Sequence, residues 1–246
     1  MKLTEHIELI GSGQMGFNLT HPLECNVYLV HDGDDAIIVD AGAGCDIEPI
    51  LRQIDQSGIP RTSIRRLLLT HAHPDHAGGV RALHDALGVD VYASPLVARY
   101  VRDGDERSAS FDRLCGPGGY PEDYAFAACP VADELREGER ITVGRLAIEV
   151  IETPGHCGGH VSFVLRRPDG VDLLSGDAIF TRGRILLQNL WDCSVAGSCE
   201  SVTRLASVRP DGLFPGHGTV SIERGWTHIY SAMESIGSML PPPQLA

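Results

Sequence analysis

Short apolar runs alternate with amphipathic segments through the first part of the chain. Runs rich in β-branched and other apolar residues predict strands at 24–31, 35–40, 64–70 and 89–93. Apolar residues at three- and four-residue spacing predict helices at 45–56, 80–87 and 95–103. The consecutive leucines 67–69 indicate that the third strand is buried on both faces.

The second part of the chain contains more strands before its helices. Apolar runs predict strands at 140–143, 146–153, 160–165, 171–174 and 212–214. Helical spacing then predicts helices at 199–206 and 221–239. Two sheets packed together with helices outside them are one arrangement that this order allows. We therefore expect one α/β domain that covers residues 1–246.

The stretch 104–130 differs from the rest because it is polar and rich in turn residues, notably at 116–121. It nevertheless contains the aromatic residues Phe111, Tyr120, Tyr124 and Phe126. Aromatic side chains in so polar a stretch need a surface on which to pack. We interpret the stretch as a lid-like insertion that lies over the domain rather than within its core. An ordinary surface loop with a short helix is the alternative.

Composition narrows the class of protein. With 43% apolar residues among 246, the chain can build a full core, which excludes intrinsic disorder. No apolar run approaches the roughly 18 residues of a membrane-spanning helix, and residues 1–14 show no continuous apolar stretch of a secretory signal. The seven cysteines are odd in number and form no CxxC pair. Reduced thiols in a cytoplasmic protein fit this pattern best.

Charge argues against nucleic acid as a partner. The chain has 20 Lys and Arg against 33 Asp and Glu, a formal net charge of −13. A surface this acidic repels a phosphate backbone, although a bound metal can reverse the field locally.

Four potential metal ligands lie within six residues, directly after the predicted strand at 64–70. They are His71, His73, Asp75 and His76, in the pattern HxHxDH. Imidazole and carboxylate suit zinc, iron or manganese. At an extended strand end, His71 and His73 point the same way, and the turn at Pro74 lets the other two approach from a second direction. The pattern favours two adjacent metal positions over a metal-free surface turn.

Three further donors each follow an apolar run and lie beside Gly or Pro. They are His156, Asp177 and His217, at spacings of 85 residues (71 to 156), 21 (156 to 177) and 40 (177 to 217). Loops that follow strands of a rigid scaffold often carry functional residues, and here we expect them to meet at one edge.

The order HxHxDH, then single His, Asp and His, resembles the metallo-β-lactamase fold superfamily. Supporting motifs are at 39–42, 153–156, 175–177 and 215–217, and the resemblance extends from residue 26 to residue 217. It implies a four-layer αββα sandwich with metals at one edge of the two sheets.

The resemblance also implies a ligand set for two zinc ions, with iron or manganese as alternatives. The first metal would be bound by His71, His73 and His156, and the second by Asp75, His76 and His217. Asp177 would bridge both metals. Asp40 matches an acid of the family that orients a ligand histidine, and a turn-capping role is the alternative.

The bridging position favours one branch of the superfamily. The best-known zinc β-lactamases have Cys where this chain has Asp177, whereas a carboxylate there resembles the glyoxalase II and lactonase branches. We therefore predict a hydrolase that cleaves a small thioester, lactone or ester with a hydroxide shared by two zinc ions. Asp75 would orient this hydroxide and move a proton to the leaving group.

Two other functions stay open at this point. A mononuclear iron persulfide dioxygenase would, by resemblance, need only His71, His156 and Asp177. A metal-binding sensor without catalysis is the second alternative. Retention of all seven expected ligands favours the hydrolase over both.

The sequence leaves the substrate contacts undecided. Candidates are Tyr120, Tyr124, Arg182 and Arg184, each with a packing or surface role as the alternative. We interpret Cys157 and His160 as structural residues beside the ligand His156. For the apolar final helix, the simpler expectation is packing on its own domain, and a homodimer interface is the alternative.

Overall fold

The computed structural model describes residues 1–115 and 120–245. The chain divides into two compact units, Met1–Leu135 and Arg136–Ala246. Each unit contains one β-sheet with helices, so the predicted mixed α/β character with two sheets is confirmed. That the whole chain acts as one domain stays a prediction.

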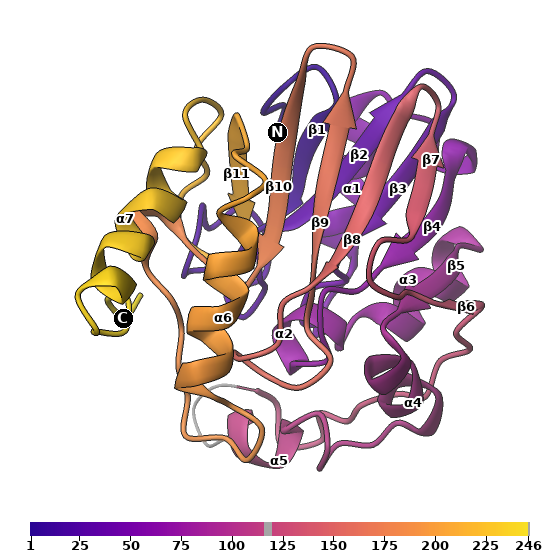
Figure 1. Ribbon diagram of the computed structural model, residues 1–246. Coiled ribbons are helices and arrows are strands. Elements are labelled where there is room, and N and C mark those ends of the chain that lie inside the picture. Colours follow the sequence, from indigo (N-terminus) through magenta and orange to yellow (C-terminus); the bar gives the residue numbers. More distant parts are fainter. Residues whose placement is uncertain (116–119, 246) are drawn as a thin grey trace. The chain divides into compact units, whose positions relative to one another are not determined.

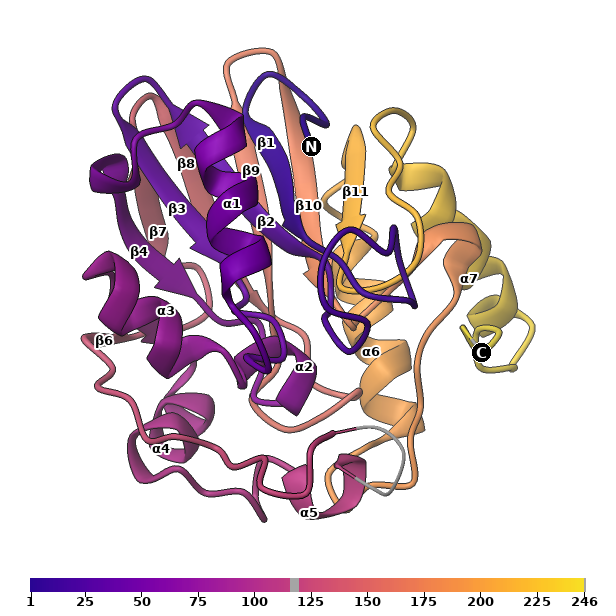
Figure 2. The ribbon, with the colours of Figure 1, turned by 180° about the vertical axis from the view of Figure 1, so that it is seen from behind.

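The first unit contains a six-stranded sheet of order β1-β2-β3-β4-β5-β6. Its strands are β1 (Ile7–Gly11), β2 (Val27–Asp32), β3 (Asp35–Val39), β4 (Ile64–Leu68), β5 (Asp90–Ala93) and β6 (Asp133–Glu134) (Figure 2). The first three strands pair antiparallel, and β3, β4, β5 and β6 pair parallel. Because β3 and β4 are parallel, Asp40 and Thr70 emerge at the same edge of this sheet.

Five α-helices accompany the described strands of the first unit. They are α1 (Glu48–Ser57), α2 (Pro74–Ala77), α3 (Val80–Leu87), α4 (Pro95–Asp103) and α5 (Phe111–Leu114). The helices predicted at 80–87 and 95–103 have the bounds of α3 and α4. The helix predicted at 45–56 begins later, at Glu48, because Pro49 is favoured in a first helical turn.

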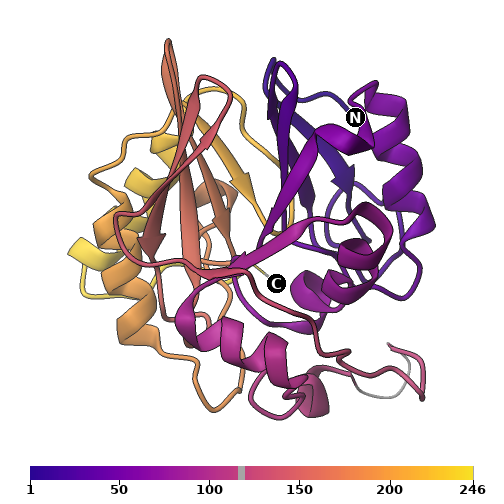
Figure 3. The ribbon, with the colours of Figure 1, turned by 90° about the vertical axis from the view of Figure 1, so that its right-hand side faces the viewer.

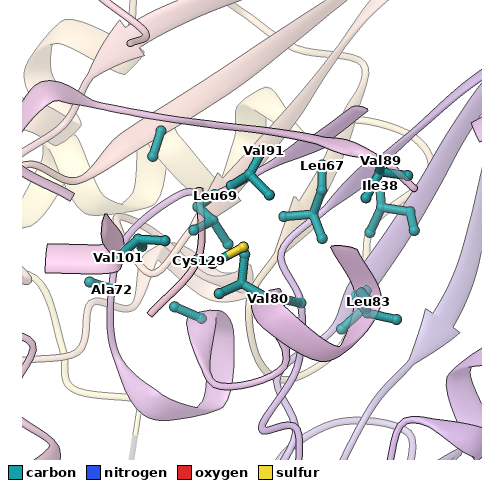
Figure 4. Packing of buried hydrophobic residues seen from close by; sticks show 14 of the residues in the cluster. Ile38, Leu67, Leu69, Ala72, Val80, Leu83, Val89, Val91, Val101 and Cys129 are labelled. Carbon is teal, nitrogen blue, oxygen red and sulfur yellow. The ribbon is translucent and has the colours of Figure 1, made fainter. Parts of the chain in front are cut away.

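Buried aliphatic side chains of the parallel strands and of α3 form the core of the first unit (Figure 4). All three leucines at 67–69 are buried, which confirms the prediction for that strand. Val80 and Leu83 of α3 pack into the same cluster. Burial of a side chain of this size contributes about 1.5–3 kcal/mol, so the cluster gives the loop that follows β4 a rigid base.

The stretch 104–130 contributes to this core. Phe111 stacks on Phe126 with ring centroids 4.4 Å apart, and Tyr124 stacks on the same Phe111 ring at 5.6 Å. Phe111 and Phe126 are buried within the cluster, so the expectation that the stretch lies outside the core is wrong for these two residues. Of the turn-rich residues 116–121, residues 116–119 lie outside the part of the chain that the structure describes. A covering role over substrate stays a prediction.

The second unit contains a five-stranded sheet of order β11-β10-β9-β8-β7 (Figure 1). Its strands are β7 (Arg140–Val143), β8 (Leu146–Glu152), β9 (Val161–Arg167), β10 (Gly170–Gly176) and β11 (Gly212–Pro215). Both β8 and β10 run antiparallel to β9, and β11 runs parallel to β10. The carboxyl ends of β8, β10 and β11 therefore reach one edge of this sheet.

Two helices, α6 (Val195–Leu205) and α7 (Trp226–Gly237), lie on one face of the second sheet, seen as orange and yellow ribbons in Figure 3. The helix predicted at 221–239 is shorter because Ser221 pairs with Leu213 instead. Ile229 and Ala232 of α7 pack into the core of this unit. The homodimer through this helix stays a prediction. Among residues 1–115 and 120–245, none of the helices combines the length and apolar character needed to cross a membrane.

Glu24, just before β2, is a buried carboxyl group. The Thr20 hydroxyl donates to its Oε2, and burial raises the pKa of Glu24 from 4.5 to about 7. Because the pKa is higher in the folded than in the unfolded state, the unfolded state releases its proton first. We expect the free energy of unfolding to fall as pH rises from about 4.5 to 7, by roughly 2–3 kcal/mol from this group.

Chemical denaturation across this pH range measures the effect. Glu24→Gln is expected to flatten the fall in the free energy of unfolding, while the exposed Glu223→Gln control keeps it. Equal pH dependence in the wild type and Glu24→Gln would refute the assignment.

Candidate metal centre

The end of β4 places two of the predicted ligands side by side in the first unit. Nε2 of His71 lies 3.1 Å from Nδ1 of His73. Two ligand atoms of one tetrahedral zinc ion, each about 2.0–2.1 Å from the metal, are separated by about 3.3 Å. The pair therefore fits one ion, bound through Nε2 of His71 and Nδ1 of His73.

The segment that follows is a single helical turn, α2, at the position where the sequence predicts a turn. Pro74 opens it, where a proline costs no hydrogen bond. The turn places Nε2 of His76 at 3.7 Å from Oδ2 of Asp75. The backbone of α2 is fixed by hydrogen bonds from Cys25 N to Asp75 O (3.2 Å) and from Ala41 N to His76 O (2.7 Å). The first unit thus brings His71, His73, Asp75 and His76 together.

The hydrogen bonds of Asp40 determine which ring nitrogen carries the proton in two of these histidines, His71 and His76. Its Oδ2 accepts a hydrogen bond from Nδ1 of His76 at 2.8 Å. It also accepts from the Thr70 hydroxyl, so Oγ1 of Thr70 in turn accepts from Nδ1 of His71, 3.0 Å away. Both imidazoles are left with an unprotonated Nε2, the form that binds a metal. Of the two roles open for Asp40, the structure shows the orienting one.

Thr70 was not identified as functional from the sequence. Its position directly before the HxHxDH pattern, with Asp40 thirty residues earlier, is the only signal that the chain offers. Side chain to side chain contacts across 30 residues are invisible to local pattern.

Replacing Asp40 by Asn is expected to weaken zinc binding by about 10–100-fold, the usual cost of losing an outer partner of a ligand histidine. Asn fits the positive φ of 64° at this position, so the backbone is preserved. Zinc competition titration measures the loss, with the exposed Asp34→Asn as the matched control. Unchanged zinc affinity in Asp40→Asn would show that this carboxylate only shapes the turn.

Tyr124 connects the stretch 104–130 to the loop after β3 and to the segment that carries the predicted ligands. Its hydroxyl lies 2.5 Å from the carbonyl oxygen of Ala43 and 3.2 Å from that of Pro74. Burial raises the pKa of Tyr124 above its ordinary value, so the phenol keeps its proton for this donation. Tyr124 therefore positions the α2 loop. A substrate contact by Tyr120, whose ring packs 4.5 Å from that of Tyr124, stays a prediction.

Gly78 leaves the space that the Tyr124 hydroxyl fills. A Cβ at this position would collide with that oxygen and with the Ala43 carbonyl. Gly78→Ala is expected to lower the free energy of unfolding by about 1–3 kcal/mol through overpacking, measured by denaturant titration. Gly237→Ala, where the added methyl meets open space, is the control. A stability loss no larger than that of the control would show that Tyr124 moves aside for the added methyl group without lowering the free energy of unfolding.

Three further donors meet at one edge of the second sheet. His156, Asp177 and His217 follow β8, β10 and β11, the strands that run in the same direction. A hydrogen bond of 2.8 Å from Gly216 N to Gly176 O joins the last two strand ends. Gly155 has φ of 141° and packs so closely against the α6 backbone at Ser198 that no side chain would fit.

One carboxylate oxygen faces two imidazoles in this unit. Oδ2 of Asp177 lies 3.5 Å from Nε2 of His156 and 3.5 Å from Nε2 of His217. Nδ1 of His156 donates to the Leu186 carbonyl at 2.8 Å, which leaves its Nε2 unprotonated. These separations are close to the roughly 3.3 Å expected between two ligands of one tetrahedral ion. The arrangement suits a carboxylate shared by two metals.

The other residues considered from the sequence have structural partners. The Arg184 guanidinium donates to the Leu245 carbonyl at 2.9 Å, and the backbone N–H of Arg182 donates to Nδ1 of His228 at 3.0 Å. Cys157 is buried, as expected for packing. Substrate contacts by either arginine stay predictions.

Comparison with known proteins now identifies the family. The sequence profile of the Metallo-beta-lactamase superfamily matches residues 21–217, so the chain belongs to this superfamily. A Cronobacter sakazakii metallo-beta-lactamase structure with a HARLDQ motif aligns with TM-score 0.73 and 20% identity over 97% of this chain and 95% of that chain. The BLEG-1 B3 metallo-beta-lactamase structure aligns with TM-score 0.70 and 25% identity, over 88% and 94% of the two chains. The predicted fold class is confirmed.

Curated relatives include enzymes of another branch. The chain is 29% identical to a beta-lactamase-like protein 2 homolog of Drosophila melanogaster over 79% of its own length and 59% of that protein's. It is also 29% identical to a hydroxyacylglutathione hydrolase of Albidiferax ferrireducens over 75% of its own length. The chain spans slightly under three fifths of the length of these two relatives.

Proposed function

We propose that this protein is a hydrolase that uses two zinc ions to cleave a small thioester, lactone or ester. The main support for the proposal is the position of the Asp177 carboxylate. A single oxygen of it lies 3.5 Å from Nε2 of His156 and 3.5 Å from Nε2 of His217. A carboxylate in this role matches the glyoxalase II and lactonase branches rather than the zinc β-lactamases with Cys there. The similarity to a hydroxyacylglutathione hydrolase supports the same substrate class.

The proposed ligands follow the superfamily pattern. His71, His73 and His156 would bind the first ion, and Asp75, His76 and His217 the second. Asp177 would be shared by both. Two adjacent zinc ions would supply a nucleophilic water at neutral pH and polarise the substrate carbonyl.

The chain's own residues then have defined tasks. Asp40 and Thr70 keep Nε2 of His71 and His76 unprotonated, so these ligands need not lose a proton on binding. The Asp75 carboxylate, which is partly exposed, would accept a proton from the attacking water and pass it to the departing alkoxide or thiolate. The leaving group is thereby released in neutral form.

The proposal extends to partners and compartment. The formal net charge of −13 supports a small acyl compound as the partner over nucleic acid. All seven cysteines are free thiols, which supports a reducing compartment such as the cytoplasm.

Elemental analysis tests the proposal, on protein produced without added zinc and without a metal-chelating tag. About two zinc ions per chain, with hydrolysis in a panel of thioesters, lactones and esters, are expected. About one iron per chain and oxygen uptake with a persulfide would overturn the hydrolase in favour of a dioxygenase. Two metals with no hydrolysis in the panel would favour a metal sensor.

A further inference from the structure

A chain of buried hydrogen bonds begins at the backbone of Asp177. The N–H of Asp177 donates to Nε2 of His160 at 3.0 Å. Nδ1 of His160 lies 2.9 Å from Oγ1 of Thr153, which lies 2.8 Å from Oγ of Ser162. The Ser162 hydroxyl then donates to the carbonyl oxygen of Ser175 at 3.1 Å. All five residues are buried in the second unit.

The two ends of this series of hydrogen bonds determine the direction of every hydrogen bond within it. A backbone N–H can only donate, so Nε2 of His160 is the acceptor and its proton is on Nδ1. Nδ1–H then donates to Thr153, whose own hydroxyl donates to Ser162. The chain ends at a carbonyl, which can only accept. His160 is therefore a neutral imidazole with both ring nitrogens engaged, and not a ligand for metal.

We propose that His160 is a positioning residue for the shared carboxylate of Asp177, through the hydrogen bond that its Nε2 accepts from the Asp177 N–H. The inference rests on the proposed function, in which Asp177 is a metal ligand. Gly176, with φ of 50°, gives the backbone unusual freedom directly before Asp177. The hydrogen bond to His160 restricts that freedom at Asp177, and metal–ligand distances lie within about 0.2 Å of their usual values.

Two substitutions separate the nitrogen atoms of His160. The amide oxygen of Gln can take the place of Nε2 and accept from the Asp177 N–H. The shorter Asn places its amide near Nδ1, where it can donate to Thr153 but leaves the Asp177 N–H without its acceptor. Both variants are polar and of similar volume, so they form a matched pair.

We expect His160→Gln to keep zinc affinity within about threefold of the wild type and His160→Asn to lose about 10–100-fold, the usual effect of an outer partner. Chelator competition measures the affinity. The absorption spectrum of the cobalt-substituted protein reports ligand geometry, and it should change only in the Asn variant. Thermal unfolding of the metal-free proteins controls for loss of fold.

The hydrogen bonds from His160 through Thr153 and Ser162 allow a second, independent test. In metal-free protein with ¹⁵N-labelled histidine, Nε2 of His160 should show the nitrogen shift of an unprotonated ring nitrogen, assigned through its absence in His160→Gln. Thr153→Val should weaken zinc binding, because the Nδ1–H loses its acceptor. Ser162→Ala, one step farther along, should have a smaller effect.

Several outcomes would overturn the inference. Equal zinc affinity in the Asn and Gln variants, whether both are normal or both are impaired, would show that the accepting nitrogen has no special role. A protonated Nε2 in the spectrum would contradict the direction of the chain. A wild-type protein that binds no metal would overturn the proposed function as well, whereas normal metal binding with equal variants would overturn this inference alone.

Discussion

Asp177→Asn is expected to lower zinc affinity and the hydrolytic rate by more than about 100-fold, beyond the usual cost of an outer partner. The substitution keeps the shape of the side chain but removes the negative charge that faces two imidazoles at 3.5 Å. A neutral amide binds zinc far less well than a carboxylate, and both ions would lose a ligand at once. Zinc titration and steady-state hydrolysis of the best panel substrate measure the two losses.

A second aspartate near β10, the strand that precedes Asp177, offers a control. Asp169 lies in the turn between β9 and β10 and forms an exposed ion pair with Arg167. Asp169→Asn is expected to leave metal content and rate unchanged, because exposed ion pairs contribute about 0–1 kcal/mol. Retention of two zinc ions and most of the activity in Asp177→Asn would remove the observation on which the proposed function rests.

Strand direction explains why the donors of each unit converge. In the first unit, the parallel pair β3 and β4 delivers Asp40 and the HxHxDH segment to one edge. In the second unit, β8, β10 and β11 share a direction and deliver one donor each. The apolar strands hold the backbone in place, and the polar residue that follows each strand lies in a loop, where its side chain is available for binding or catalysis.

The sequence predicted this arrangement well where local pattern decides it. Apolar runs followed by Gly or Pro and a single His or Asp identified all three donor loops of the second unit. The bounds of α3, α4 and β7 match their predictions, because each element is delimited by its own Gly, Pro or turn residues. That these donors bind metal stays a prediction.

Contacts between residues far apart in sequence account for what the sequence did not reveal. The hydrogen bonds that Asp40 accepts from Thr70 and His76 cross 30 and 36 positions, and the one that Tyr124 donates to Ala43 crosses 81. The polar composition of 104–130 suggested a surface segment, yet Phe111 and Phe126 pack together in the core. Composition averages over a segment, whereas burial is decided for each side chain.

The role of His160 shows the same limit from another direction. Sequence alone supports a histidine satisfied by its surroundings, and the structure agrees that it is one. What the sequence lacks is the identity of the donor, the N–H of Asp177, and with it the position of the ring proton. A residue can therefore be structural by its contacts and still position a neighbouring residue that is predicted to bind metal.

His73→Ala is expected to reduce binding of the first zinc ion by more than about 100-fold, and activity with it, while the fold stays intact. His73 follows the end of β4 and its removed ring is polar, so the free energy of unfolding of the metal-free protein should change by only about 1 kcal/mol. Added zinc should raise the melting temperature of the wild type much more than that of the variant, since a ligand stabilises only the state that binds it.

A matched histidine separates loss of a ligand from loss of any imidazole. His84 in α3 lies in the same unit, where its Nδ1 contacts the Val89 carbonyl at 2.7 Å. His84→Ala should keep both zinc ions and the response of the melting temperature to zinc. Global unfolding of metal-free His73→Ala would mean that the HxHxDH segment supports the fold rather than catalysis. Because metal content, stability and rate are measured on the same two variants, that result and loss of a catalytic ligand are distinguishable.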